Sequence, residues 1–323
     1  MRGTVLGGSN NFFSVECEDG ATRLCSLKSK RLDDGGQYYN PLAPGDSVTL
    51  EQDPLDTGKG QIIARDERRN EFVRWNIKRR MPQVLAANLD CLMVVTTPAR
   101  PDFRPRFVDR ALCQAEMLGI SPAVLCNKYD LAGADSPAAH EVERRLSVWE
   151  EIGYTVLRVS ARTGEGLPEL ASFMEGRLTA LVGQSGVGKS SIVNVLDSSC
   201  VLRTGSLSQK YGKGTHTTTR GTLVRLRVNE ALTDGIRNVR ASIIDTPGVK
   251  SFALNGIAAE DLALYFRELR PLLGRCAFGM SCTHTHESGC SVLEALRSGR
   301  VSAERFESWQ RIRDELKSGK YAD

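Results

Sequence analysis

The chain has 323 residues and a formal net charge of +4, with 25% charged and 41% hydrophobic residues. This length allows two or three domains, and the composition is that of a globular protein, which excludes a disordered or fibrous chain. No apolar run reaches the ~20 residues that a membrane-spanning helix needs, and the N-terminus lacks the pattern of a signal peptide, so we expect a cytoplasmic protein without a membrane partner.

The N-terminal part of the chain predicts a small β-barrel. Short strands are expected at residues 12–17, 21–27, 47–51 and 61–64, with turns rich in Gly, Asp or Pro between them. Short strands at this spacing are typical of a barrel. We place the first domain at residues 1–66.

The positive charge is unevenly distributed along the chain. Seven Lys or Arg residues lie between Arg65 and Arg80, and a second basic stretch runs from Arg297 to Lys320. Such a run is most often a solvated surface, but it can also bind the phosphate backbone of a nucleic acid. Both interpretations stay open from sequence alone.

Strands and helices alternate after the predicted barrel. This alternation predicts a parallel sheet with helices on both faces, which we place at residues 67–265, followed by a third domain at residues 266–323. The expected strands are residues 89–97, 123–126, 155–159 and 178–182, and the expected helices are residues 106–118 and a helix opened by Ser136-Pro137.

Residues 183–190, GQSGVGKS, match the phosphate-binding pattern G-x-x-x-x-G-K-[ST]. The glycines let backbone N–H groups point at phosphate oxygens, and a helix starting near Lys189 adds its dipole. We expect Lys189 to reach the β- and γ-phosphates and Ser190 to ligate Mg²⁺. Further nucleotide contacts are expected from Gly183, Gln184, Ser185, Gly186, Val187, Gly188 and Ser191.

A second motif indicates that the nucleotide carries guanine. Asn127, Lys128 and Asp130 fit N-K-x-D directly after a predicted strand. The Asp130 carboxylate can accept hydrogen bonds from guanine N1–H and the 2-amino group, which adenine does not offer. Asn127 can brace the phosphate loop, and Lys128 can lie along the base and ribose. Ser160-Ala161, after the next strand, resembles the backbone element that contacts guanine O6.

A third motif, Asp245-Thr246-Pro247-Gly248, resembles the DxxG element of GTPases. Asp245 would hold Mg²⁺ through a water molecule, and the N–H of Gly248 would sense the γ-phosphate. A switch threonine that binds Mg²⁺ is expected in the preceding segment, residues 212–219, where Thr218 and Thr219 fit equally well.

The group that positions the attacking water differs from the usual glutamine. Many GTPases place a glutamine just after the DxxG element, but Val249 follows it here, so slow intrinsic hydrolysis is expected. His216 is the candidate for this role, and a structural histidine is the alternative. The expected catalytic residues are thus His216, Lys189 and Thr219.

The order of these motifs differs from that of an ordinary GTPase. The chain runs N-K-x-D, Ser-Ala, phosphate loop, threonines and DxxG, whereas the ordinary order begins with the phosphate loop. We interpret this as a circularly permuted α/β P-loop GTPase domain, which surface termini would tolerate. The predicted switch segments then close the domain, so we infer that the part after about residue 265 is the output element.

A cluster of cysteine and histidine lies in the third domain. Cys276, Cys282, His284 and Cys290 form C-x5-C-x-H-x5-C, and three thiolates with one imidazole suit a closed, structural Zn²⁺ site. His286 is an alternative fourth ligand. Helices are expected to flank the cluster at residues 258–269 and 303–316.

Together these features resemble the RsgA (YjeQ) family of small-subunit ribosome-biogenesis GTPases. The resemblance covers nearly the whole chain, although the family usually has one residue fewer between its first two zinc cysteines. It implies an OB-fold first domain, a circularly permuted GTPase domain and a mostly helical, zinc-binding C-terminal domain. It also implies GTP or GDP with Mg²⁺ as ligand, the 30S subunit and its 16S rRNA as partners of a monomer, hydrolysis stimulated by the subunit, and action in late maturation.

Two other functions are compatible with the same residues. The missing glutamine also fits a nucleotide-gated RNA-binding scaffold with negligible turnover. The Cys/His cluster would also serve a GTPase that delivers metal ions. GTP hydrolysis measured with and without small subunits distinguishes the scaffold from a ribosome-stimulated GTPase. Tight retention of the metal argues against metal delivery.

Overall fold

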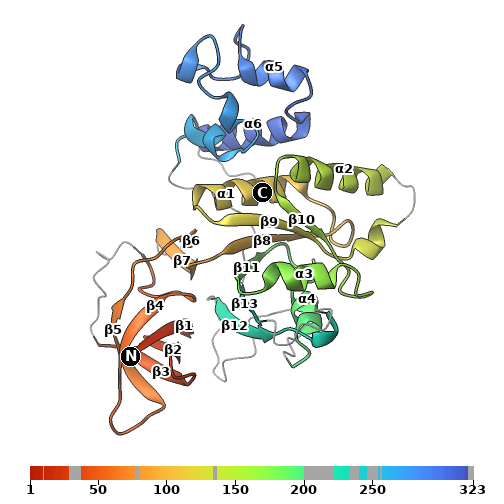
Figure 1. Ribbon diagram of the computed structural model, residues 1–323. Helices are drawn as coiled ribbons and strands as arrows, with labels where there is room; N and C mark the ends of the chain where they lie inside the picture. Colours follow the sequence, from red (N-terminus) through yellow and green to blue (C-terminus); the bar gives the residue numbers. More distant parts are fainter. Residues whose placement is uncertain are drawn as a thin grey trace.

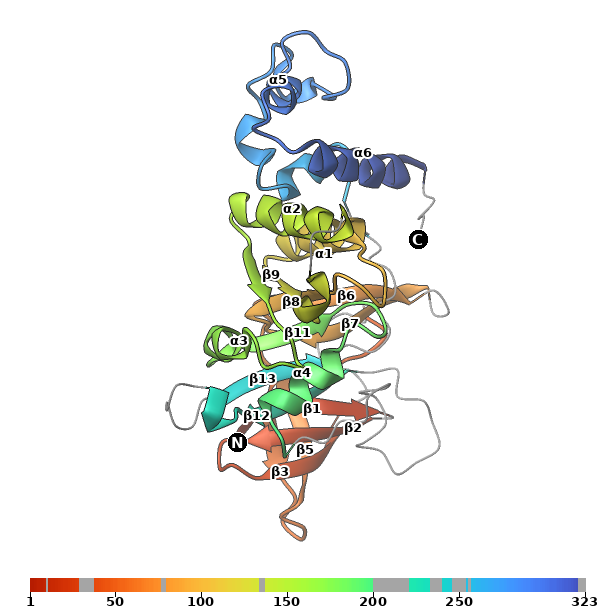
Figure 2. The same cartoon turned by 90° about the vertical axis from the view of Figure 1, so that its right-hand side faces the viewer.

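The computed structural model describes residues 1–9, 11–28, 38–76, 80–133, 137–199, 221–232, 240–245, 254 and 257–318. Three parts follow one another along the molecule: a barrel, a sheet with helices on its faces, and a C-terminal part that holds α5 and α6 (Figures 1 and 2). Within the described ranges, no helix has the length and apolar character needed to cross a membrane.

The N-terminal part is a closed barrel with the strand order β1-β2-β3-β5-β4, in which β3 and β5 pair in parallel. This confirms the predicted barrel and its OB-fold class. The sequence did not predict β1, because three glycines weaken its strand pattern. The strands are β1 (Arg2–Ser9), β2 (Phe12–Cys17), β3 (Thr22–Leu27), β4 (Ser47–Gln52) and β5 (Lys59–Arg65).

A two-stranded hairpin that the sequence did not predict joins the barrel to the rest of the chain. It consists of β6 (Glu71–Asn76) and β7 (Met81–Ala87), paired antiparallel. Its β6 strand lies within the first basic stretch. The charged side chains there had suggested surface, but β6 packs Phe72, which is 1% exposed, against the core of the sheet.

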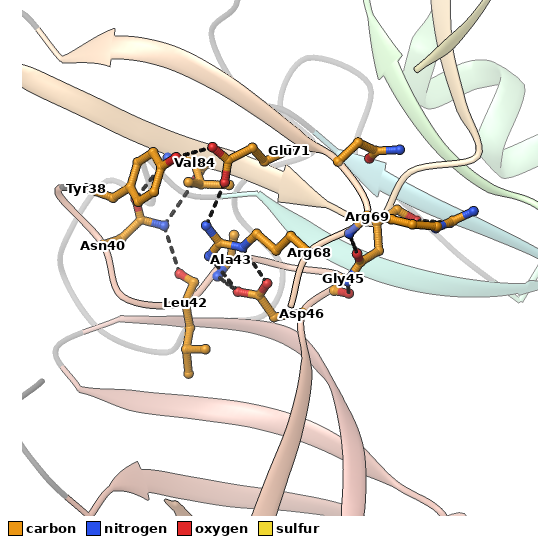
Figure 3. Close-up of polar contacts among 12 residues, drawn as sticks. Tyr38, Asn40, Leu42, Ala43, Gly45, Asp46, Arg68, Arg69, Glu71 and Val84 are labelled. Atoms are coloured by element: carbon orange, nitrogen blue, oxygen red, sulfur yellow. Dashed lines mark hydrogen bonds and ion pairs between the residues drawn. The ribbon is translucent and has the colours of Figure 1, made fainter. Parts of the chain in front are cut away.

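Arg68 fastens the hairpin to the barrel. Its Nε and Nη2 donate to the two carboxylate oxygens of Asp46 at 2.7 and 2.9 Å, and Nη1 donates to Glu71 at 2.9 Å (Figure 3). The Arg68 side chain is 5% exposed and that of Asp46 is fully buried. For Arg68, therefore, both sequence interpretations are wrong: it is neither solvated nor free to bind phosphate, because buried charges need paired partners.

The central sheet has six strands in the order β10-β9-β8-β11-β13-β12. The first five are parallel, and β8, β9, β10 and β11 confirm the four predicted strands. The strand β13 was not predicted, and the edge strand β12 runs antiparallel to it. Residues 228–239 join these two strands, a connection at the lower limit for a parallel crossover. The strands are β8 (Cys91–Thr96), β9 (Ser121–Cys126), β10 (Thr155–Arg158), β11 (Leu178–Val182), β12 (Thr222–Arg227) and β13 (Arg240–Asp245).

Helices cover both faces of the sheet, as predicted. In β8, Leu92 and Val94 face the cluster formed with α1 and α2, while Met93 and Val95 face the cluster formed with α3 and α4. Near-continuous apolar strands such as β8 are typical of a sheet buried on both sides. The helices are α1 (Pro105–Met117), α2 (Pro137–Glu151), α3 (Leu167–Met174) and α4 (Lys189–Leu196), with 3-10 turns η1 (Tyr129–Ala132) and η3 (Glu230–Leu232).

The C-terminal part contains α5 (Ser291–Arg297) and α6 (Ala303–Ser318), and α6 confirms the helix predicted at 303–316. The helix predicted at 258–269 is wrong, because the backbone of Phe266 is extended (φ −107°, ψ 108°) and ends the short turn before it. Its ring is fully buried beneath the guanidinium of Arg305, 4.6 Å from the ring centroid. That segment instead forms the 3-10 turns η4 (Asp261–Tyr265) and η5 (Arg270–Leu272), with η6 (Gly279–Ser281) further on.

A buried ionic network holds the C-terminal part against α1. Arg305 donates to Asp109 of α1 at 2.7 Å and to Glu268 at 2.6 Å, and its side chain is only 1% exposed. Ser308 of α6 and Trp149 of α2 also donate to Asp109, at 2.5 and 2.8 Å. Arg305, a member of the second basic stretch, is thus a structural residue at a domain junction.

Replacing Arg305 by leucine is expected to cost about 3–5 kcal/mol of unfolding free energy, because Asp109 and Glu268 would stay buried without their cation. Urea unfolding of the full chain measures this loss. Arg311→Leu is the control, since Arg311 pairs with Glu307 on the exposed side of α6, where both side chains are about half exposed. Equal midpoints for the two variants would contradict the assignment.

Candidate functional site

The predicted motifs meet at the carboxyl edge of the sheet. Ser160 closely follows β10, Asn127 follows β9, Gly183 follows β11, and Asp245 is the last residue of β13. The sheet order places these strands side by side around β8, although they come from distant parts of the chain. In open α/β sheets, ligands bind outside the carboxyl ends of the strands. The permuted sequence order is therefore compatible with one continuous site.

Close backbone approaches explain the glycines of the phosphate loop. A Cβ atom at Gly183 would lie 2.4 Å from the carbonyl oxygen of Val95, and one at Gly188 would lie 2.2 Å from Asn127 Nδ2. Gly188 also has φ +93°, a conformation that favours glycine. A larger residue at either position would push the loop away from the neighbouring strand ends.

Lys189 begins α4, directly after the loop. Its ammonium group donates to the carbonyl oxygens of Gly183 and Gln184 at 2.7 and 3.0 Å, so the charge lies within the loop. The N-terminus of α4 adds backbone N–H groups and the positive end of the helix dipole. Ser190 and Ser191 lie partly buried in the first turn of α4, while Ser185 is exposed in the loop. This arrangement suits a polyphosphate.

Asn127 connects three motifs through its buried side chain. Its Nδ2 donates to the Val187 carbonyl oxygen at 2.8 Å, and its Oδ1 accepts from the Ala161 N–H at 3.2 Å. Lys128 donates to the Gly186 carbonyl oxygen at 2.7 Å. The N-K-x-D motif, the Ser-Ala element and the phosphate loop are thus tied together.

Asp130 is held by its neighbours in the Ser-Ala segment. Its Oδ1 accepts from the Ser160 hydroxyl at 2.6 Å, and that hydroxyl accepts from the Thr163 N–H at 3.1 Å. Its Oδ2 accepts from Arg162 Nε at 3.0 Å and Nη2 at 2.6 Å. The hydrogen bond from Ser160, with help from Arg162, lowers the pKa of Asp130, so the carboxylate stays ionised at neutral pH.

Sequence reasoning missed Arg162 and Thr163. They belong to no nucleotide-binding pattern, and the only available signal was their position directly after Ser160-Ala161. Part of the predicted site, including the half facing the γ-phosphate, lies outside the described residues. For Asp245, only the backbone is described, next to Leu181 of β11. The positions that lie outside the description altogether are His216, Thr218, Thr219 and Gly248.

The Cys/His cluster forms a second candidate site. One ligand atom from each of Cys276, Cys282, His284 and Cys290 lies within 4.8 Å of the others, and all four residues are buried. The sulfur atoms of Cys276 and Cys290 are 3.8 Å apart, and His284 Nδ1 is 3.6 and 3.3 Å from them. Two sulfur atoms on a tetrahedral zinc, with bonds of about 2.3 Å, would lie about 3.8 Å apart.

The chemistry of the cluster also fits a metal ion. Burial lowers the pKa of His284, which favours the neutral imidazole that binds metals. Cys290 is the N-cap of α5, where its sulfur accepts from the Leu293 N–H at 3.5 Å. His286, the alternative ligand, is exposed and lies outside the group. The four clustered residues could therefore hold a metal ion.

Comparisons with known proteins agree with these features. A family model described as RsgA GTPase matches residues 65–255. The small ribosomal subunit biogenesis GTPase RsgA of Porphyromonas gingivalis is 36% identical over 323 residues, which is 99% of each chain. The crystal structure of YjeQ from Thermotoga maritima matches with a TM-score of 0.74 and 27% identity, over 98% of each chain.

A second solved structure supports the permuted fold. YloQ, described as a circularly permuted GTPase, matches with a TM-score of 0.71 and 22% identity, over 100% of this chain and 96% of its own. The family model covers more than half of the chain, and the P. gingivalis relative covers almost all of it. From the strand order, the motifs at the sheet edge and these comparisons, we conclude that the chain belongs to the RsgA GTPase family.

Proposed function

We propose that this protein binds and hydrolyses GTP and acts as a cytoplasmic factor in the late maturation of the 30S ribosomal subunit. The observation that supports guanine-nucleotide binding is the position of the Asn127 side chain, which joins the guanine-recognition motif, the Ser-Ala element and the phosphate loop. The proposed role in ribosome maturation is supported by the P. gingivalis relative, whose name assigns that protein to small-subunit biogenesis.

Guanine recognition would rest on Asp130. Its carboxylate, oriented by Ser160, would accept from N1–H and the 2-amino group of the base. The N–H of Ala161 would donate to guanine O6, and Lys128 would lie along the base. An adenine base would leave the carboxylate desolvated and without these donors.

The phosphates would bind over residues 183–191. Backbone N–H groups and the N-terminus of α4 would hold their oxygens, and Lys189 would move from loop carbonyls to the β- and γ-phosphates. Hydroxyl and carboxylate oxygens suit Mg²⁺, and Ser190, Asp245 and Thr218 or Thr219 would hold it. When bound, Mg²⁺ neutralises negative charge on the transferring phosphate. We assign positioning of the attacking water to His216.

The barrel and the exposed basic residues are the proposed 16S rRNA contacts of a monomeric protein. Phe12 and Leu24, on neighbouring strands of the barrel, are 55% and 50% exposed. An exposed aromatic ring can stack on an RNA base. With Arg68 and Arg305 engaged in the structure, the exposed cations of the two basic stretches include Arg80, Arg297 and Arg300.

We further propose one structural Zn²⁺ ion bound by Cys276, Cys282, His284 and Cys290. The burial of all four residues supports a closed site. With four protein ligands, no position would remain for a substrate, so the ion would order the C-terminal part.

Hydrolysis assays with purified full-length protein test the proposal. We expect slow GTP hydrolysis by the protein alone and an increase of about tenfold or more with 30S subunits, because partners that order a GTPase site raise turnover strongly. ATP as substrate and 50S subunits as particle are the controls. Co-sedimentation with a non-hydrolysable GTP analogue should exceed that with GDP.

Binding to 30S subunits without any stimulation would favour the nucleotide-gated scaffold. Equal hydrolysis of ATP and GTP would remove the guanine assignment. Equal stimulation by 50S subunits would remove the small-subunit assignment.

A further inference from the structure

The carboxylate that would select guanine is already engaged by a side chain outside the motif. Arg162 approaches Asp130 Oδ2 with two N–H groups, from Nε at 3.0 Å and Nη2 at 2.6 Å. The Arg162 side chain is 75% exposed, whereas that of Asp130 is 10% exposed. An exposed cation is thus paired with a mostly buried anion.

A count of acceptor positions shows that this pairing conflicts with guanine. A carboxylate offers about four lone-pair positions, two on each oxygen. In Asp130, Ser160 uses one position on Oδ1 and Arg162 uses both on Oδ2. One position, on Oδ1, is left. Guanine brings two donors, N1–H and the 2-amino group, and a two-point contact needs one position on each oxygen.

We propose that Arg162 competes with guanine for Asp130, so that at least one of its hydrogen bonds is released when a guanine nucleotide binds. The inference rests on the proposed guanine function and adds a residue that sets the affinity and the release of the base. As the base departs, the exposed guanidinium returns to Oδ2 and replaces the lost donors. Arg162 thereby keeps the buried carboxylate paired and makes the nucleotide easier to exchange.

Inosine nucleotides separate this competition from a general effect of charge. Hypoxanthine has N1–H but lacks the 2-amino group, so it can use the position left on Oδ1 without displacing Arg162. Removing Arg162 should therefore strengthen GDP binding more than IDP binding. A loss of positive charge near the phosphates would instead change both affinities alike.

The experiment measures dissociation constants of GDP and IDP, with Mg²⁺, for the full-length wild type, Arg162→Ala and Arg162→Lys. We expect Arg162→Ala to bind GDP about two- to fivefold more tightly, the range of an exposed ion pair. Its gain for IDP should be smaller, and Arg162→Lys, which offers a single ammonium group, should fall between. Arg311→Ala is the matched control, because Arg311 also forms an exposed ion pair, with Glu307 at 2.7 Å, on α6.

A GDP dissociation constant that is unchanged or higher in Arg162→Ala overturns the inference, and so do equal gains for GDP and IDP. Wild-type protein that binds GDP no better than ADP is a different result: it removes the proposed guanine function, and the inference with it. Tighter GDP binding by Arg162→Ala, with a smaller gain for IDP, supports both the guanine function and the competition by Arg162.

Discussion

Replacing Lys189 with alanine is expected to reduce GTP turnover by about 100-fold or more, the loss seen when one preorganised donor to a developing negative charge is removed. In the structure, the Lys189 ammonium lies within the phosphate loop, bonded to the carbonyl oxygens of Gly183 and Gln184. Single-turnover hydrolysis at saturating GTP, with nucleotide binding measured in parallel, gives the size of the loss.

The fold of this variant should stay intact, because the two loop hydrogen bonds of Lys189 go to carbonyl groups of half-buried residues, which water can reach once the side chain is removed. Lys59→Ala is the matched control: Lys59 is 60% exposed and pairs with Asp56 in a barrel turn. We expect the control to hydrolyse GTP like the wild type. Turnover by Lys189→Ala at the control level would remove the phosphate-loop assignment.

Local motifs could be predicted from the sequence because their chemistry is local. The loop at residues 183–190 needs glycines for its backbone and a lysine at the start of a helix, and both requirements are visible in eight consecutive residues. The strands β8, β9 and β11 are mostly apolar, so their burial and their order along the chain were also predictable.

Long-range pairing could not be predicted in the same way. Arg68 and Arg305 are arginines in basic stretches. Nothing in the neighbouring residues reveals that they are buried in ion pairs with Asp46 and Asp109. The same holds for Arg162, whose partner lies 32 positions earlier in the chain. Phe266 illustrates the opposite error: its spacing fits a helix, but its backbone is extended and its ring lies beneath the Arg305 guanidinium.

The described strand that follows the predicted switch threonines in the chain contacts the barrel. The C-terminal part, inferred to be the output element, rests on α1 through Asp109. The barrel contacts β12: Arg225 of β12 pairs with Glu16 at 2.8 Å, and a Cβ at Gly7 would lie 3.4 Å from the Gly221 carbonyl oxygen. Leu254, which follows the DxxG element in the chain, packs in the apolar cluster of the C-terminal part, so both flanking parts contact described residues next in sequence to the predicted switch segments.

Removing the proposed Zn²⁺ from the Cys/His cluster is expected to unfold the C-terminal part. Structural zinc sites bind with an apparent free energy of about 10–16 kcal/mol at neutral pH, comparable to the whole stability of a typical domain, about 5–15 kcal/mol. Between Leu269 and Ser291 the described chain has only short 3-10 turns, so the four ligands are its main cross-links.

Cys282→Ala should therefore lose the bound zinc and make the C-terminal part sensitive to protease, while GDP binding by the central domain persists. Mass spectrometry measures the metal content. Limited proteolysis with and without a chelator measures the protease sensitivity of the C-terminal part. Cys113→Ala is the matched control, because Cys113 is fully buried in the same apolar cluster but is not one of the four ligands. It should retain zinc and lose only about 1 kcal/mol of stability, a typical cost of one substitution.

The ligand set also gives the direction of the pH dependence. Zinc binding requires thiolates, and protons compete for them, so the chelator should remove the metal faster as the pH falls. If the wild-type protein carries no zinc and its C-terminal part still resists protease, the cluster is held together by packing alone. A metal that exchanges readily and is lost on GTP hydrolysis would instead favour metal delivery, because a closed site with four protein ligands releases its ion only when the surrounding fold opens.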